Sequence, residues 1–425
     1  MGLIQNYEKL AKTPQRKIVL DLVEAALESI EPERVIGQKV SLSGDNLKIE
    51  NTSINLQDYR RIIILGFGKG SARNIKIIEN MLGAKITEGY VIDTNEEQFQ
   101  KIEFAKGTHP LPSQANLDFT KKIIQKLSDL AQNDLVIVAT CGGGSVMLAA
   151  PNNLTLEQMI EVNKTLLHSG ANIHDMNVIR KHIDLAKGGG LAKILYPARV
   201  INLIFSDVPG NDLSVIASGP MVKDPTTQKD VAEVINKYKL EDELSHVQSN
   251  FIESPKEDKY FANVENILIL SNDTALHAMQ QKARKLKIET TVYSNSFQQD
   301  ANEAGETLIG QTKQNSILLV GGETDVKVTG KGVGGRNQQL VLSSLAHLDE
   351  NTIICSFDSD GWDNSPAAGA IADNNTAKAA GKLNLNPQTF IKNNDAFTFF
   401  DKVGDAILTG RLPTNVSDLM VVYKK

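Results

Sequence analysis

Short apolar runs recur along the chain, and most of them end in a small or polar loop. They occupy residues 62–65, 89–92, 135–140, 200–205, 267–270, 317–320 and 352–357. Helical segments such as Leu117–Ala131 and Leu156–Leu167 separate most of them. Continuous apolar strands that alternate with helices are typical of a mostly parallel sheet buried on both faces. The pattern therefore predicts an α/β fold, and we expect the loops after the strands to share one edge, where α/β proteins bind ligands.

The length of the chain and one charged segment predict two domains. With 425 residues the chain exceeds one typical core. The segment Leu240–Val264 is rich in charge. We place the boundary there, which gives a Rossmann-like α/β domain over 1–250 and a smaller α/β domain over 251–425. Apolar residues three and four apart predict a helix over Tyr7–Ile30.

One glycine-rich stretch, Gly321–Leu340, has the character of an anion site. Glycine frees backbone N–H groups and allows close approach to a ligand. The start of a helix adds partial positive charge, and Arg336 adds a planar donor fork suited to carboxylate or phosphate. We expect a short strand at Val326–Val328 and a helix over Leu340–Leu345. The alternative is a glycine-rich hairpin followed by a helix cap.

The loop Gly66–Ser71 almost matches the dinucleotide-binding fingerprint. Ser71 replaces the third glycine, and Asp93 ends the next strand, where a ribose-binding acid would sit. These features favour a nicotinamide enzyme. Lys69 counts against it, because a lysine in this loop would meet a phosphate or a carboxylate as a point charge. A tight turn with a surface lysine is the third interpretation.

The loop Cys141–Ser145 is better suited to phosphates. Gly142, Gly143 and Gly144 expose consecutive N–H groups, and the helix that follows adds its dipole. Cys141 is a weak candidate for a nucleophile, because the sequence fixes no base beside it.

Carboxylates are frequent in or near the strand-end loops. They are Asp207, Asp212, Glu323, Asp325, Asp358, Asp360 and Asp363. Magnesium that arrives with a nucleotide needs only one or two carboxylates. Most of the seven are therefore expected to cap helices or form turns. His109 and His182 stand in distinctive loops without metal-ligand spacing, and we expect both to be structural.

The composition argues against some classes of binding partner and indicates the cellular compartment. The net charge is −6, and no long basic run marks a nucleic-acid or anionic-membrane surface. No apolar stretch reaches the roughly 18 residues of a membrane span, and residues 1–8 lack a signal pattern. Cys141 and Cys355 are the only cysteines. This usage suits a reducing cytoplasm and argues against a disulfide framework or a cysteine metal site.

Taken together, the loops resemble one family, the MOFRL-class or type II glycerate 2-kinases. The matching blocks are Gly68–Gly70, Gly107–Pro112, Gly142–Ser145, Asn177–Ile183, Lys187–Gly189, Ser206–Leu213, Ile216–Pro220, Gly321–Thr324, Gly334–Gln338, Asp360–Gly361 and Thr414–Leu419. They follow one another in order from about residue 66 to residue 419.

The resemblance implies an ATP- and Mg²⁺-dependent kinase that phosphorylates D-glycerate at its 2-hydroxyl. It also implies two α/β domains with the active site in the cleft between them. In the family, the lysine matching Lys69 and the arginine matching Arg336 are held essential. Two departures stand out: Cys141 replaces a common serine, and the segment Asn364–Gly369 is one residue shorter than usual.

A kinase of this kind needs phosphate donors, cations and carboxylates, and we expect these loops to supply them. Gly142, Gly143, Gly144 and Ser145 would bind nucleotide phosphates. Lys69 and Arg336 would be catalytic, on the moving phosphoryl group or on the glycerate carboxylate, with Asp207 as a further substrate contact. The magnesium candidates are Asp207, Glu323 and Asp360. The sequence by itself does not divide these roles.

Three other functions stay open at this point. The main alternative is an NAD(P)H-dependent hydroxypyruvate reductase, which the Gly66–Ser71 loop favours. A phosphosugar-binding regulator and a kinase for another small hydroxy acid are the others. The oligomeric state is also open, with a homodimer as one option.

Overall fold

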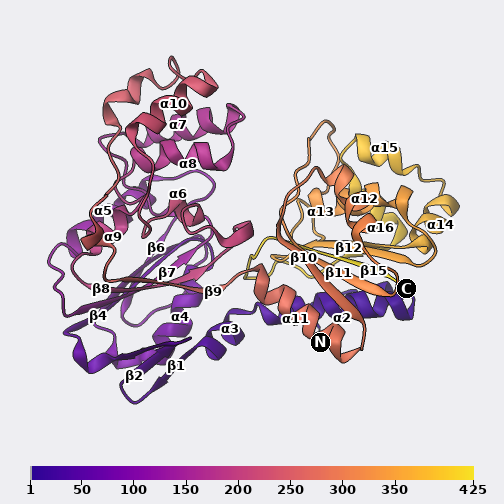
Figure 1. The fold of residues 1–425 in the computed structure, drawn as a ribbon, viewed down its shortest axis with the longest axis horizontal. Helices are drawn as coiled ribbons and strands as arrows, with labels where there is room; N and C mark the ends of the chain where they lie inside the picture. The colour runs from indigo at the N-terminus through magenta and orange to yellow at the C-terminus, as the bar shows by residue number, and fades with distance from the viewer. Residues whose placement is uncertain (1) are drawn as a thin grey trace. The chain divides into compact units, whose positions relative to one another are not determined.

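Two six-stranded sheets organise the protein in its computed structural model, which describes residues 2–425 (Figure 1). One sheet belongs to a compact unit of residues 35–269, here called the central unit. The other belongs to the terminal unit, in which the N-terminal segment up to Arg34 joins residues 270–425. Within the described chain, no helix has the length and apolar character needed to cross a membrane. The predicted α/β fold is confirmed.

The central unit is built on a mostly parallel sheet with the strand order β6-β5-β4-β7-β8-β9. Its strands are β4 (Arg61–Phe67), β5 (Glu88–Asp93), β6 (Ile102–Lys106), β7 (Asp134–Cys141), β8 (Arg199–Phe205) and β9 (Val264–Leu270). The pairs β4–β5, β5–β6, β4–β7 and β7–β8 are all parallel. Their near-continuous apolar sequences suit strands covered by helices on both faces.

Helices cover both faces of this sheet. Ile63 and Leu65 of β4 pack on one face with Phe119 of α5 (Gln114–Lys126), and α6 (Gly144–Met147) and α9 (Gly190–Leu195) join the same core. On the other face lies α4 (Ser71–Leu82), since a Cβ added at Gly66 would meet the Ile75 side chain at 2.9 Å. The glycine therefore lets α4 pack closely against β4.

Two smaller parts complete the central unit. The helices α7 (Leu156–His168), α8 (Ile173–His182) and α10 (Gln228–Tyr238) share a separate apolar core around Val162, Ile179 and Val234. The other elements are α3 (Pro32–Lys39), β1 (Val40–Ser43), β2 (Asn46–Ile49) and β3 (Thr52–Asn55), with the 3₁₀ turns η1 (Leu56–Asp58), η2 (Gly83–Lys85), η3 (Pro209–Asn211), η4 (Ile216–Ser218), η5 (Ser245–Asn250) and η6 (Asp258–Tyr260). The three short strands form their own antiparallel sheet.

The terminal unit has a mixed sheet with the order β10-β11-β15-β12-β13-β14. The strands are β10 (Glu289–Phe297), β11 (Ser316–Gly322), β12 (Thr352–Asp358), β13 (Gly369–Ala372), β14 (Ala406–Ile407) and β15 (Asp418–Lys424). β10 and β11 are parallel, whereas β15 runs antiparallel to both β11 and β12, between them. The last strand of the chain therefore begins where its two neighbours end.

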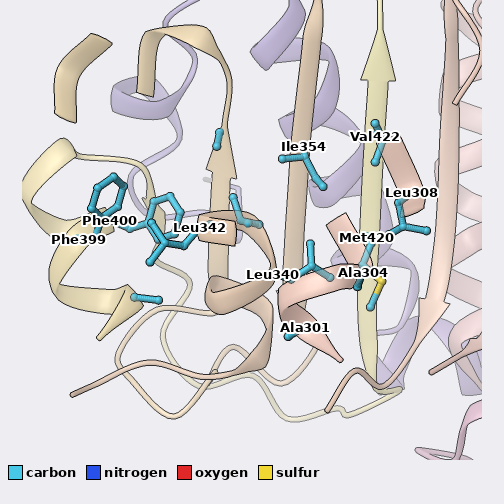
Figure 2. Close-up of a cluster of buried hydrophobic side chains, with 14 of the residues drawn as sticks. Ala301, Ala304, Leu308, Leu340, Leu342, Ile354, Phe399, Phe400, Met420 and Val422 are labelled. Carbon is cyan, nitrogen blue, oxygen red and sulfur yellow. The ribbon is translucent and has the colours of Figure 1, made fainter. Parts of the chain in front are cut away.

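One face of this sheet carries the main apolar core (Figure 2). Met420 and Val422 of β15 pack there with Leu340 and Leu342 of α13, and with Phe399 of α16. The helices of the unit are α1 (Tyr7–Leu10), α2 (Pro14–Ser29), α11 (Asn272–Lys285), α12 (Ala301–Gln311), α13 (Arg336–Ser344), α14 (Asn374–Lys382), α15 (Pro387–Lys392) and α16 (Ala396–Val403), with the turn η7 (Leu345–His347). In Figure 1, α2 and α11 lie against the opposite face of the sheet.

Two local expectations differ from the structure. The segment Val326–Val328 is not a strand, because its backbone makes no sheet ladder. The helix expected over Tyr7–Ile30 is broken, and α2 starts afresh at Pro14. Thr13 caps this new start by accepting a hydrogen bond from the Arg16 N–H at 3.2 Å. Proline is tolerated at the first helical position because its missing N–H would have no helical partner there.

A buried arginine joins the N-terminal helix α2 to the rest of the terminal unit. The guanidinium of Arg16 donates to Asp373 (Nε–Oδ2, 2.8 Å; Nη2–Oδ1, 2.9 Å) and to Asp405 (Nη1–Oδ1, 2.7 Å). The Arg16 side chain is fully buried. These ion pairs connect α2 to residues more than 350 positions later in the sequence. Both parts therefore belong to one unit.

The pairing connects the N-terminal segment to the terminal unit, whereas we predicted a single boundary at 250/251. The division of the structure falls at 34/35 and at 269/270. The charged segment chosen as a linker instead packs on the central unit, where the N–H of Ile252 donates to the His182 carbonyl at 2.7 Å. Charge content alone does not tell a linker from a solvated surface segment.

Helix α13 begins at a carboxylate from a distant part of the chain. Asp363 accepts hydrogen bonds from the backbone N–H groups of Asn337 (3.2 Å) and Gln338 (2.9 Å). Both N–H groups lie in the first turn, where the helix itself offers no acceptor. Burial raises the pKa of Asp363 to about 6, although these hydrogen bonds oppose the shift.

Replacing Arg16 should strongly destabilise the terminal unit. Arg16→Met would leave the buried carboxylate of Asp373 without its cation and Asp405 with Lys12 alone. Breaking such a buried pair typically costs about 3–5 kcal/mol of unfolding free energy. The matched control is Arg34→Met, because Arg34 and Glu28 are both about half exposed and 3.8 Å apart. We expect the control to change stability by no more than about 1 kcal/mol. Denaturant unfolding measures both, and equal losses would contradict the prediction.

Asp363 should make stability depend on pH in a defined direction. Its folded pKa of about 6 lies above the roughly 3.9 of an unfolded aspartate, so only the folded state holds the proton between these values. The stabilisation from this group is complete below about pH 4 and is lost as the pH rises through the folded pKa. Relative to Asp363→Asn, the wild type should lose about 1.4 kcal/mol of unfolding free energy per pH unit in this window. A difference between the two proteins that stays constant with pH would disprove this.

Candidate functional site

The strand order of the central sheet brings two glycine-rich loops together. The chain adds β5 and β6 on one side of β4 and then returns to add β7 and β8 on the other side. The loops after β4 and β7 therefore diverge at a switch point, where open α/β sheets bind ligands. At this point the backbone N–H of Lys69 donates to the Gly142 carbonyl at 2.8 Å.

Two glycines of the second loop leave space that other side chains use. A Cβ at Gly142 would collide with the carboxylate of Asp207, from the loop after β8. A Cβ at Gly143, which has a left-handed φ of +73°, would lie 2.9 Å from His109 Cδ2 and 3.4 Å from Lys69 Cε. The structure therefore gathers Lys69, Asp207 and His109 around Gly142 and Gly143.

Burial and the charge of Lys69 together shift the pKa values of Asp207 and His109. Burial raises the pKa of Asp207, and the charge of Lys69 partly offsets that rise. Burial also lowers the pKa of His109, and the charge of Lys69 lowers it further. A neutral imidazole and a carboxylate thus lie close to one cation. We had expected His109 to be structural, although its distinctive loop, Gly107–Pro112, was the signal that could have placed it here.

Ser145 and Cys141 are held within the loop by neighbours. Ser145 Oγ lies 2.8 Å from Ser218 Oγ, and Ser218 in turn donates to Asn177 Oδ1 at 2.8 Å. Cys141 is buried beside Asn74, whose Nδ2 donates to Cys141 Sγ at 3.4 Å. Burial raises the pKa of the Cys141 thiol well above its ordinary value, so a thiolate nucleophile is disfavoured.

Asp93 does not have the exposed position of a ribose-binding acid. Its carboxylate is buried and accepts a hydrogen bond from the Ala72 N–H at 2.9 Å, in the first turn of α4. The N–H groups of Thr94 and Asn95 also donate to it. Burial raises the pKa of Asp93. The carboxylate is therefore a helix cap, which removes one of the two features that favoured a dinucleotide site.

In the terminal unit, Arg336 lies among three carboxylates. Its Nε and Nη2 donate to Asp418 at 2.6 and 3.1 Å. Its Nη1 lies 2.8 Å from Glu323, and its Nη2 lies 3.7 Å from Asp358. Asp418 is directly opposite Asp358 in the sheet register, because β15 runs antiparallel to β12. Arg336, which the sequence offered as a donor fork for an anionic ligand, therefore already has carboxylate partners within the protein.

Arg336 is one positive charge among the three carboxylates of Glu323, Asp358 and Asp418. Asp358 and Asp418 are both buried, and burial raises the pKa of each. Their mutual repulsion raises the pKa of Asp358 further. The arginine opposes this shift in both. Sequence reasoning missed Asp418, although it stands in the Thr414–Leu419 block that resembled the family.

The three magnesium candidates have different surroundings. Asp207 lies at Gly142, and Glu323 is paired with Arg336. The side chain of Asp360 accepts a hydrogen bond from the Trp362 N–H at 2.9 Å, which makes it a turn former. Across residues 2–425, no three His, Cys, Asp or Glu side chains are grouped so that they could hold a metal.

Comparisons with known proteins agree with the motifs. A model described as the MOFRL family matches residues 316–418, and one described as a domain of unknown function (DUF4147) matches residues 18–253. D-glycerate 2-kinase of Thermotoga maritima is 32% identical, covering 96% of this chain and 97% of that protein. Glycerate 2-kinase of Picrophilus torridus is also 32% identical, covering 99% of each chain.

A solved structure extends this likeness to the fold. The crystal structure of glycerate kinase from Thermotoga maritima matches with a TM-score of 0.84 and 30% identity, covering 96% of this chain and 99% of that one. Both the sequence and the fold therefore match over nearly the whole length. The chain belongs to the family that its motifs resemble, the MOFRL-class or type II glycerate 2-kinases.

Proposed function

We propose that the protein is an ATP-dependent glycerate 2-kinase, which transfers the γ-phosphoryl group of ATP to the 2-hydroxyl of D-glycerate. The relatives named D-glycerate 2-kinase and glycerate 2-kinase cover nearly its whole length. The structural observation that supports the proposal best is the meeting of Lys69 and the Gly142–Ser145 loop at the switch point. Phosphoryl transfer depends mainly on positioning and on charge stabilisation, and such a loop supplies both.

We assign the nucleotide phosphates to Gly142, Gly143, Gly144 and Ser145. Helix α6 starts at Gly144, and the first N–H groups of a helix have no acceptor within it. Gly143 turns the chain in the left-handed region so that consecutive N–H groups are presented together. This arrangement suits phosphate oxygens.

Lys69 is assigned to the group in transfer. Its side chain is exposed beside Gly143, so a phosphate on the loop would come within reach of the ammonium. In a loose transition state negative charge spreads over the three equatorial phosphoryl oxygens, and a fixed cation stabilises it.

Asp207 is the carboxylate that would hold magnesium. It lies against Gly142, and one or two carboxylates suffice when phosphate oxygens complete the coordination. Magnesium bound with ATP would supply positive charge to the β and γ phosphates. Glu323, which pairs with Arg336, and Asp360, which accepts from the Trp362 N–H, are the alternative candidates.

Arg336 keeps its proposed role as an anion-binding catalytic residue. The buried Asp418 holds Nε and Nη2 in the bidentate manner, which fixes the plane of the guanidinium. The contact of Nη1 with Glu323 is the more exposed one, since Glu323 is 45% exposed and Asp418 is fully buried. An anionic ligand, phosphoryl or carboxylate, would replace Glu323 and leave Asp418 in place.

The nicotinamide alternative has less support in the structure than in the sequence. Asp93 caps α4, and Ser71 is buried with its hydroxyl donating to the Ile92 carbonyl at 3.1 Å. Neither group presents a side chain for a ribose or a pyrophosphate. We therefore expect no function as a hydroxypyruvate reductase.

The direct test is an assay of the purified protein with D-glycerate and Mg-ATP, in which the two phosphoglycerate isomers are separated. We expect 2-phosphoglycerate and ADP in equal amounts. Chelation should stop the reaction and added magnesium should restore it, because the metal arrives with the nucleotide. Formation of 3-phosphoglycerate would contradict the proposed hydroxyl, and NADH-dependent reduction of hydroxypyruvate would contradict the kinase.

Lys69→Met should lower kcat by roughly a hundredfold or more, because transition-state charge would lose its cation. The backbone bond to Gly142 does not involve the side chain, so the variant should stay folded. Lys121→Met, on the exposed side of α5, is the matched control and should keep wild-type turnover. Near wild-type kcat in folded Lys69→Met would remove Lys69 from the mechanism.

A further inference from the structure

A small cavity lined by both apolar and polar side chains lies next to the Gly142–Ser145 loop, within the central unit. Its polar and charged lining residues are Ser145, Asn163, Arg180, Asp184 and Lys187. Its free volume is about 10 Å³, which is roughly the space that one water molecule or one ligand oxygen needs. None of these residues except Ser145 has a role in the proposed mechanism.

Among residues 2–425, no anionic side chain pairs with Arg180, the arginine of this cavity. It stands near the end of α8, and its Nε donates to Asn163 Oδ1 at 3.1 Å. In the part of the chain that the structure describes, no carboxylate forms an ion pair with it, and burial alone lowers its pKa. A guanidinium has five N–H donors, so most of its capacity is left for a ligand.

The other charged groups of the cavity do not compensate Arg180. Lys187 is buried and forms an ion pair with Asp184. The Asp184 carboxylate also accepts from the N–H groups of Ala150 (3.1 Å) and Ala186 (2.9 Å). Arg180 is close enough to Lys187 to lower its pKa by repulsion. The cavity therefore carries one excess positive charge in a partly desolvated place, which favours an anion.

A second, independent observation concerns Asn177, which is linked to Ser145 through Ser218. The hydroxyl chain from Ser145 through Ser218 ends at Asn177, one turn before Arg180 on α8. Asn177 is 3% exposed, and its Nδ2 has no hydrogen-bond partner. A buried donor without an acceptor is costly and often marks a place where a ligand or water binds.

We propose that Arg180 binds an anionic oxygen group of a bound substrate, with Lys187 and the Ser145–Ser218–Asn177 chain beside it. The group is the carboxylate of the hydroxy acid or a phosphate of the nucleotide, since both carry an anionic oxygen that a guanidinium binds, and the cavity has room for one such oxygen. This inference rests on the proposed function for the identity of the substrates. It adds a binding residue from α8 to a site otherwise made of strand-end loops.

The test compares Arg180→Gln with the wild type in steady-state kinetics. Loss of a charged contact should raise one KM by about tenfold or more. A rise for D-glycerate alone identifies the carboxylate, and a rise for ATP alone identifies a phosphate. Arg199→Gln is the matched control. Arg199 is the first residue of β8, at the end of the strand opposite to the loop that carries Asp207, and it pairs with Glu265 at 2.7 Å. The control should leave both KM values within about twofold.

A second variant separates binding from folding. Asn163→Ala keeps the charge of Arg180 but removes the hydrogen bond that orients it. It should raise the same KM as Arg180→Gln, by a smaller factor, with little change in kcat. If Arg180→Gln does not fold, this variant alone decides: unchanged KM values for both substrates would overturn the proposal.

A binding measurement keeps this inference distinct from the proposed function. Melting temperatures of the wild type and Arg180→Gln are compared with D-glycerate, Mg-ADP and inorganic phosphate in turn. We expect at least one of the three to stabilise the wild type and to stabilise Arg180→Gln less. If the wild type phosphorylates no D-glycerate, the proposed function fails, while such a lost stabilisation still supports an anion site. Equal ligand responses in the two proteins would overturn the anion site itself.

Discussion

The return of the chain across the central sheet is the constraint on which the candidate site depends. After β6 the next strand does not extend the edge but pairs with β4 on its free side. The carboxyl ends of β4, β7 and β8 then lie next to one another, and each contributes one loop. Lys69, Gly142 and Asp207 come from these three loops. The glycines are needed because Asp207 and His109 occupy the space that side chains would take.

A different constraint organises the terminal unit. Because β15 runs antiparallel between β11 and β12, its first residue meets their last residues. This register buries Asp418 beside Asp358, and two close carboxylates require a cation. Arg336 fulfils that requirement from the start of α13, while Asp363 caps the same helix. The geometry of this arginine is therefore set by structural carboxylates, whether or not a ligand is bound.

Four basic side chains of the protein differ in burial and in their carboxylate partners, and these differences indicate different roles. Arg16 is fully buried and paired with two carboxylates, which is a structural arrangement. Lys69 is exposed beside a glycine loop, where its ammonium can reach a phosphate bound on that loop. Arg336 combines fixed carboxylates with one more exposed contact. Arg180 is partly buried with no carboxylate partner among the described residues, so its charge is the one that a ligand would balance.

The sequence determined a large part of this description. Apolar runs separated by helical segments predicted the α/β fold, because strands buried on both faces must be apolar along their whole length. The same runs located the loops that carry Lys69 and Gly142–Ser145, because ligand loops follow strands directly. The ordered motifs also identified the family, and the comparisons confirm it.

Tertiary structure decided which residues are neighbours when they are distant in sequence. The membership of α2 in the terminal unit, the pairing of Arg336 with Asp418 and the role of Asp93 as a helix cap all depend on strand order and strand direction. Local patterns do not identify the neighbours of a strand, because the antiparallel β15 is as continuously buried along its length as the parallel strands of the central sheet. The raised pKa of Asp207 follows from burial, which exists only once the elements have packed. Packing also decides that, among the described residues, no carboxylate pairs with Arg180.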